Sequence, residues 1–168
     1  MPWRRPHRFW RHAATDHMSV RRAFPPPAIT AIEAAIGAGE KTHRGQVCVA
    51  IEASLPALRV MRKLSPRERA LEVFGLLRVW DTEENCGVLV YLLLADRDVE
   101  IIADRGIHRA VGDERWQAIC QRMEAEFHNG KFAEGVVRGV QEIAASLAAH
   151  FPRTGAGTNE IPDKPVIL

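Results

Sequence analysis

An uninterrupted apolar run stands in the middle of the chain. Residues 88–94 read VLVYLLL, in which the tyrosine hydroxyl is the only polar side-chain group. A strand that is apolar on both faces has to be covered on both faces, so the run predicts a central strand of a layered α/β sheet. It is far too short to cross a bilayer. The turn residues 95–98 and the mixed segment 99–103 predict a second strand that forms an antiparallel hairpin with the first.

Two further patterns precede this hairpin. Residues 28–41 repeat apolar positions at helical spacing and predict a helix, whereas residues 46–54 alternate like a strand. Ser65, followed by Pro66 and Glu68, is typical of a capped helix start, and that helix is predicted to reach Trp80. A strand–helix–strand connection of this length makes the two strands parallel. We therefore expect a small mixed sheet.

Helices are also expected after the hairpin. Asp113 is predicted to cap a helix that ends near Asn129, and residues 131–150 predict another. The prolines at 25–27 separate an N-terminal arm, residues 1–27, from a folded domain over residues 28–152. Residues 153–168 are rich in glycine, proline and charge, so we expect a flexible tail unless residues 165–168 dock on the domain.

Composition places the chain among ordinary globular proteins. It has 168 residues, of which 46% are hydrophobic and 26% charged, which is enough for one core. The three cysteines form no disulfide framework or metal-binding spacing, and the first residues lack the apolar segment of a secretory signal. We therefore expect a cytoplasmic protein with no transmembrane segment.

The charge of the chain is unevenly distributed. Residues 1–24 contain six arginines against one aspartate, a formal charge of +5, which leaves −3 for the rest of a chain whose total is +2. Tryptophan and phenylalanine alternate with these arginines. An arm of this kind can contact anionic lipid headgroups or nucleic acid. It can equally pack on its own domain or on a second subunit.

A polar rim is expected where the hairpin strands begin and end. Because the strands are antiparallel, the loop before the first strand lies beside the residues that follow the second. Carboxylate and amide oxygens suit a divalent cation, and a guanidinium fork suits phosphate. The predicted cation ligands are Asp81, Glu84, Asn85, Asp104 and Asp113. Arg105 and His108 are the predicted phosphate-binding residues.

The same residues also have a purely structural interpretation, as solvated loop charges and a helix cap. Parallel pairing of the first and central strands adds His43 and Arg44 to the neighbourhood of this rim. A histidine there can act as a general acid or base, although most loop histidines are only surface residues. No catalytic residue is assigned from the sequence.

Several short motifs in this order resemble the TPM domain family. They are residues 85–90 (NCGVLV), the turn 95–98 with its following strand, Gly106 and Ile107 leading to Asp113, and Phe127 to Gly135. The resemblance covers roughly residues 28–151. It implies a three-layer α/β/α, Rossmann-like sandwich with a small mixed sheet. For some family members it also implies acid phosphatase activity or calcium binding near the sheet edge.

The chain departs from the family pattern at one informative place. Residues 104–108 read DRGIH where the family commonly has Gly-x-Gly-Leu-Glu, so His108 replaces an acidic ligand and Asp104 adds one. The cofactor implied is Ca²⁺ or another divalent cation.

Two functions follow from these features. The first is a TPM-domain protein with a metal- or phosphate-binding acidic edge and phosphatase-like activity. The alternative is a non-enzymatic interaction or assembly module whose basic arm contacts a membrane complex or an acidic protein partner, rather than nucleic acid.

Overall fold

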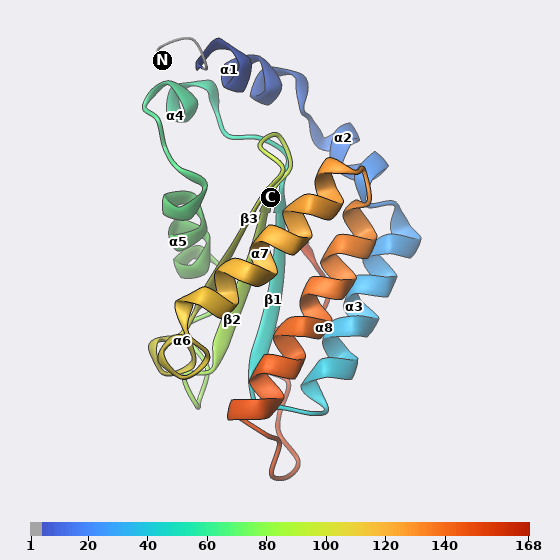
Figure 1. Ribbon diagram of the computed structural model, residues 1–168, viewed down its shortest axis with the longest axis vertical. Helices are drawn as coiled ribbons and strands as arrows, with labels where there is room; N and C mark the ends of the chain where they lie inside the picture. The colour runs from blue at the N-terminus through green and yellow to red at the C-terminus, as the bar shows by residue number, and fades with distance from the viewer. Residues whose placement is uncertain (1–4) are drawn as a thin grey trace.

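The computed structural model describes residues 5–168, which form a layered arrangement of helices around one sheet (Figure 1). In chain order the elements are α1 Arg5–Ala14, α2 His17–Ala23, α3 Pro26–Glu40, β1 Gln46–Glu52, α4 Ala57–Met61, α5 Pro66–Leu76, β2 Gly87–Leu93, β3 Asp98–Ala103, α6 Arg105–Val111, α7 Asp113–His128, α8 Phe132–His150 and β4 Val166–Ile167.

The sheet is mixed, as predicted. Its strand order is β3-β2-β1-β4. β1 and β2 run parallel, with Gln46 opposite Gly87. β2 and β3 form the antiparallel hairpin, with Val88 opposite Ala103. The start of β2 and the end of β3 therefore lie side by side.

Helices cover both faces of this sheet, which confirms the three-layer α/β/α sandwich. Every residue of β1 and β2 is buried. Val47, Val49 and Ile51 pack in one core with α3, α7 and α8, which lie together over one face in Figure 1. Cys48 and Ala50 point to the opposite core, formed with α4 and α5. The alternation of the strands thus separates two cores.

The polar groups inside these strands are satisfied. Tyr91 is fully buried, and its hydroxyl donates a hydrogen bond of 2.5 Å to Glu52. Arg69 of α5 donates two hydrogen bonds of 2.9 Å to the same carboxylate. α5 itself starts at the capping box predicted at Ser65 and Glu68. The buried charge of Glu52 is therefore paired, as burial of a carboxylate requires.

The N-terminal arm packs on its own domain. Asp96, in the turn between β2 and β3, lies 2.9 Å from both Arg8 and Arg11 and 3.2 Å from His12. His12 also accepts a 2.9 Å hydrogen bond from the Leu55 amide through Nδ1. Val20 and Phe24 belong to the main core, so α2 is continuous with the domain.

Several boundaries differ from the sequence predictions. α5 ends at Leu76 rather than Trp80, and Arg78 just beyond it has a positive φ of 53°. Asp113 is the first residue of α7 rather than its cap, because Gly112 occupies that place with φ 88°. Segments 57–61 and 105–111 form short helices that were not predicted. Each is a local geometry that loop residues adopt under tertiary packing.

The C-terminal segment is not a wholly flexible tail. Val166 and Ile167 form β4, which pairs in parallel with Ala50 and Ile51 of β1. This is the docking of residues 165–168 that the sequence left open. Among the described residues, no helix combines the length and the apolar character that crossing a bilayer requires.

We expect Gly87→Ala to destabilise the protein by about 3–5 kcal/mol, because its added Cβ meets buried backbone. That atom would lie 1.8 Å from the carbonyl oxygen of Val79. Urea unfolding measures the change. The matched control is Gly75→Ala in α5, where nothing lies within 4 Å of the new Cβ. It should stabilise the helix by about 0.5–1 kcal/mol. Equal effects of the two variants would contradict the close approach at Gly87.

Candidate functional site

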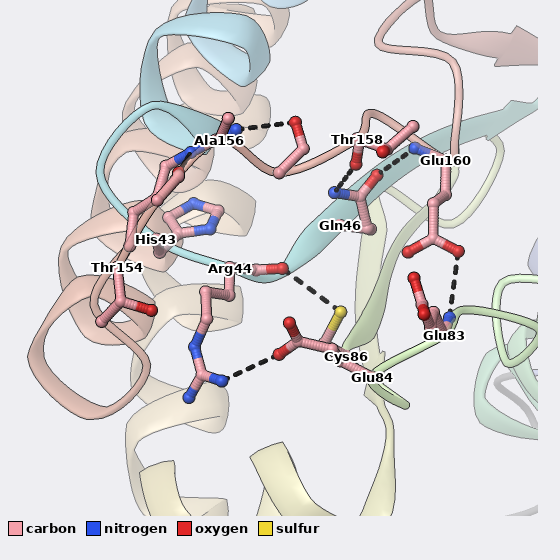
Figure 2. Close-up of a pocket in the computed structure, with 13 residues that line it drawn as sticks. His43, Arg44, Gln46, Glu83, Glu84, Cys86, Thr154, Ala156, Thr158 and Glu160 are labelled. Carbon is pink, nitrogen blue, oxygen red and sulfur yellow. Dashed lines mark hydrogen bonds and ion pairs between the residues drawn. The ribbon is translucent and has the colours of Figure 1, made fainter.

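A polar cavity of about 260 Å³ opens at the amino ends of β1 and β2. Figure 2 shows its walls: the start of β1, the loop before β2, and the segment after α8. The lining residues are His43, Arg44, Gln46, Glu83, Glu84, Cys86 and residues 153–158 with Glu160. Three stretches far apart in the sequence therefore build one pocket.

Two side chains fix the C-terminal wall of this pocket. Gln46, the first residue of β1, accepts hydrogen bonds from the amides of Glu160 and Ile161 at 2.8 and 3.2 Å. Arg153 donates to the carbonyl oxygens of Gly155 and Gly157 at 3.0 and 2.9 Å, and to that of Glu40. The guanidinium of Arg153 is thus used to shape the wall, and residues 154–158 curve around it.

The opposite wall carries the charged groups. Arg44 forms an ion pair of 2.8 Å with Glu84, and both side chains are about half exposed. The thiol of Cys86 donates to the carbonyl oxygen of Arg44 at 3.2 Å. Burial raises the pKa of this thiol, so Cys86 is no activated nucleophile. Glu160 accepts from the amide of Glu83 at 2.9 Å, which ties the two walls together.

His43 closes the bottom of the pocket. It is 1% exposed, and neither ring nitrogen has a hydrogen-bond partner among the described residues. Burial lowers its pKa from 6.5 to about 4, so the ring is neutral at pH 7. Gly39 and Gly45 on either side of it allow α8 to approach closely, because a Cβ on them would lie 2.8 Å from the Ala144 side chain and 2.9 Å from that of Leu147.

Glu40 is a second buried titratable group, three residues before this histidine in the chain. Its carboxylate accepts a 2.9 Å hydrogen bond from the Val47 amide. Burial, with a smaller contribution from Asp163, nevertheless raises its pKa from 4.5 to about 7. Burial therefore shifts the pKa of both groups toward the neutral form, and of the two only His43 lines the pocket.

The predicted cation ligands are not brought together. Asp81 pairs with Arg78, Glu84 pairs with Arg44, and Asp113 accepts from Gln117 in its own helix. Asp104 does lie beside the start of β2, as the hairpin predicts, but it accepts a 2.8 Å hydrogen bond from the Gly87 amide. Asn85 is exposed in the turn with φ 49°.

This arrangement does not fit a divalent cation. Within residues 5–168 as described, no group of three or more His, Cys, Asp or Glu side chains is placed to hold one ion. Arg105 and His108, the predicted phosphate-binding residues, lie on the short helix α6 and do not line the pocket. Of the predicted site residues, only Glu84 lines it.

Sequence reasoning missed Gln46, Arg153 and Glu160. A glutamine at the start of a buried strand was the one available signal, because a side chain of 6% exposure at that place needs polar partners. His43 and Arg44 were placed near this rim by the parallel pairing of β1 with β2, and the structure confirms their position.

The comparisons with known proteins agree with this fold. The model of the TPM domain family matches residues 21–146. The chain belongs to the TPM domain family. In the NMR structure of the BA42 protein from the psychrophilic bacterium Bizionia argentinensis, the fold is similar with a TM-score of 0.74 and 28% identity, covering 84% of this chain and 92% of that one. No curated protein matches the chain.

The match leaves out one wall of the pocket. It ends at residue 146, whereas residues 153–160 lie beyond it in this TPM domain. This wall of the pocket is therefore not part of the segment that matches the family.

The pH dependence of the unfolding free energy should report the titration of the two buried groups Glu40 and His43. Because the folded state holds the Glu40 proton up to about pH 7 and the unfolded state only to 4.5, this group lowers stability as pH rises through that window. His43 has the opposite effect. Between about pH 4 and 6.5 its ring is protonated in the unfolded state but neutral in the folded state, so its contribution to stability increases as pH rises.

Glu40→Gln keeps an oxygen for the Val47 amide and removes the titration. We expect the unfolding free energy of this variant, relative to the unmodified protein, to increase between pH 5 and pH 8 in urea titrations. Glu33→Gln changes an exposed glutamate of the same helix and should show no such trend. A pH-independent difference for Glu40→Gln would show that this carboxyl titrates normally in the folded protein.

Proposed function

We propose that this TPM domain binds a small oxyanion of the phosphate monoester class in the pocket at the amino ends of β1 and β2. Arg44 is the clamp. Its partner Glu84 is exposed, and an exposed pair of this kind contributes only about 0–1 kcal/mol, so a phosphate can replace the carboxylate at little cost. A guanidinium binds phosphate through two parallel hydrogen bonds.

The C-terminal wall supports the same ligand. In the described chain, the amides of residues 154–158 donate to no other protein group. Gly155 and Gly157 flank Ala156 there, and the hydroxyl-bearing residues Thr154 and Thr158 also line the pocket. Free amides and hydroxyls are donors that phosphate oxygens use. The arrangement of Arg44 opposite this wall is the observation that carries the proposal (Figure 2).

We also propose that the bound ester is hydrolysed, which is supported by the family resemblance. The pocket offers one group toward it. His43 is neutral and has unpaired ring nitrogens, so it could accept a proton from an attacking water once the wall opens. No step through a metal ion is included, because the described residues do not fit one.

A second candidate is docking on an anionic lipid surface, which we infer from the helices α1 and α4. These short helices pack against each other at one end of the molecule (Figure 1). Trp10 of α1 is 67% exposed, and Leu58 and Met61 of α4 are each 68% exposed. Such large apolar side chains on short helices are typical of interfacial contact.

Positive charge accompanies these apolar side chains. Arg62 and Lys63, directly after α4, pair with no acidic group of the described residues. Arg8 and Arg11, by contrast, are used inside the molecule to hold Asp96. The charge beside α4 therefore comes from Arg62 and Lys63 rather than from Arg8 and Arg11. Electrostatic attraction to anionic headgroups adds about 1 kcal/mol per such residue near the surface.

Substitution of Arg44 tests the phosphate site. We expect phenyl phosphate to bind, and Arg44→Gln to weaken binding about 10–100-fold, since a charge-assisted hydrogen-bond pair is lost. Glu84→Gln should strengthen it by freeing Arg44. Arg78→Gln removes the same charge from an exposed residue outside the pocket and should have little effect. NMR titration measures affinity, and release of nitrophenol from its phosphate ester measures turnover.

These measurements separate the claims. Equal weakening by Arg44→Gln and Arg78→Gln would mean that phosphate responds to overall charge and has no site here. Binding without nitrophenol release would retain the oxyanion site and reject hydrolysis.

Vesicle binding tests the lipid contact. We expect the protein to co-sediment with vesicles that contain phosphatidylglycerol, to do so less as salt rises, and not to sediment with pure phosphatidylcholine. Trp10→Ser combined with Lys63→Gln should reduce the bound fraction several-fold. Leu71→Ser, at a residue that is 52% exposed on α5, is the control for lost apolar surface elsewhere. If the control reduces binding as much as the double variant, α1 and α4 are not the contact.

A further inference from the structure

The strand β3 is one of the two edge strands of the sheet in the described chain. β4 covers the outer edge of β1 where Ala50 and Ile51 pair with it, whereas β3 pairs only with β2 in the described chain. Helices α5 and α7 both contact β3. An edge strand with helices over both faces presents a row of peptide groups between two walls, which is a template for another strand.

The outward peptide groups of this edge are held by side chains. The amide of Val99 donates to Glu124 of α7 at 3.1 Å. The carbonyl oxygen of Ile101 accepts from Arg67 of α5 at 2.7 Å. A carboxylate on an amide and a guanidinium on a carbonyl take the places that the backbone of a neighbouring strand would take. The backbone of an added strand could therefore take over the hydrogen bonds that the side chains of Glu124 and Arg67 now make with this edge.

A groove of about 540 Å³ lies along this edge. β3 forms its floor, and one face of α7 forms its wall at positions 113, 116, 117, 120, 121 and 124. Trp116 belongs to this wall and is 3% exposed, and its Nε1–H is buried with no acceptor among the described groups. A buried indole N–H normally has a partner, so this donor is an unsatisfied polar group in the helix that forms the wall.

The charge of the groove selects the partner. Glu100, Glu124 and Asp113 line it against the single cation Arg67. Asp98 is the first residue of β3. Its pKa is raised to about 7, mainly by burial and further by repulsion from Glu124 and Glu100. Carboxylates that crowd each other in this way are stabilised by an added cation. Lysine or arginine side chains fit this surface.

We propose that the β3 edge and the face of α7 beside it form a docking site for an extended, basic segment of a partner protein, which adds to the sheet as a fifth strand. The backbone of the segment pairs with Val99 and Ile101 and displaces Glu124 and Arg67. Its basic side chains then lie among the carboxylates of Glu100, Asp113 and Glu124. Main-chain bonds supply affinity and alternate side chains supply specificity in this mode of recognition. The site is separate from the phosphate pocket at the amino ends of β1 and β2.

The test uses the full chain and a capped, fluorescein-labelled hexapeptide of alternating lysine and valine. Fluorescence anisotropy measures its dissociation constant. We expect saturable binding that weakens at least tenfold in Gln121→Lys, which places a cation at an exposed position of the groove wall. Gln141→Lys makes the same change at an exposed position of α8, outside the groove, and should bind as the unmodified protein does.

A second peptide separates strand addition from charge attraction. It has the same lysines, with proline in place of the central valine, and it cannot donate at that position. We expect it to bind at least tenfold more weakly, and the amide of Val99 to gain hydrogen-exchange protection only with the first peptide. Equal affinity for both peptides, or equal effects of Gln121→Lys and Gln141→Lys, would overturn the proposal. So would a dimer that Gln121→Lys dissolves, since a second copy would then occupy the edge.

Discussion

The need to bury both faces of two strands shapes the whole molecule. β1 and β2 have no exposed residue, so each requires helices above and below it. α5 connects the two strands on one side, and α3, α7 and α8 cover the other. Glu52, a carboxylate carried into this interior by β1, is met by Tyr91 and Arg69 together. The candidate pocket and the docking groove accordingly lie at the ends of the strands and at the β3 edge.

The two ends of the strands differ in what they offer. At the carboxyl end, Asp96 is already held by Arg8 and Arg11, so its charge serves to fasten α1. At the amino end, Arg44 has only an exposed partner and faces a wall of unbonded amides. Charges that are equally visible in the sequence thus have different availability. Partner geometry, rather than residue type, decides which of them can bind a ligand.

The sequence predicted what depends on local pattern. The run 88–94 and the capping box at Ser65 led directly to β2 and α5, and the hairpin correctly placed Asp104 beside Gly87. The sequence could not predict which loop charges pair with each other. Asp81 forms an ion pair with Arg78, whose backbone has a positive φ that no sequence pattern indicated. Nor could the sequence predict the C-terminal wall of the pocket. The side-chain oxygen of Gln46 accepts a hydrogen bond from the amide of Glu160, which lies more than a hundred positions away in the chain.

β4 has a consequence for how the chain acquires its structure during synthesis. Ala50 and Ile51 lie in the first third of the sequence, yet the strand that pairs with their outer edge is residues 166–167. While the ribosome is still making the helices, that flank of β1 has no backbone partner and is open to unwanted pairing. Assembly of the sheet is complete only once residues 166–167 have left the ribosome.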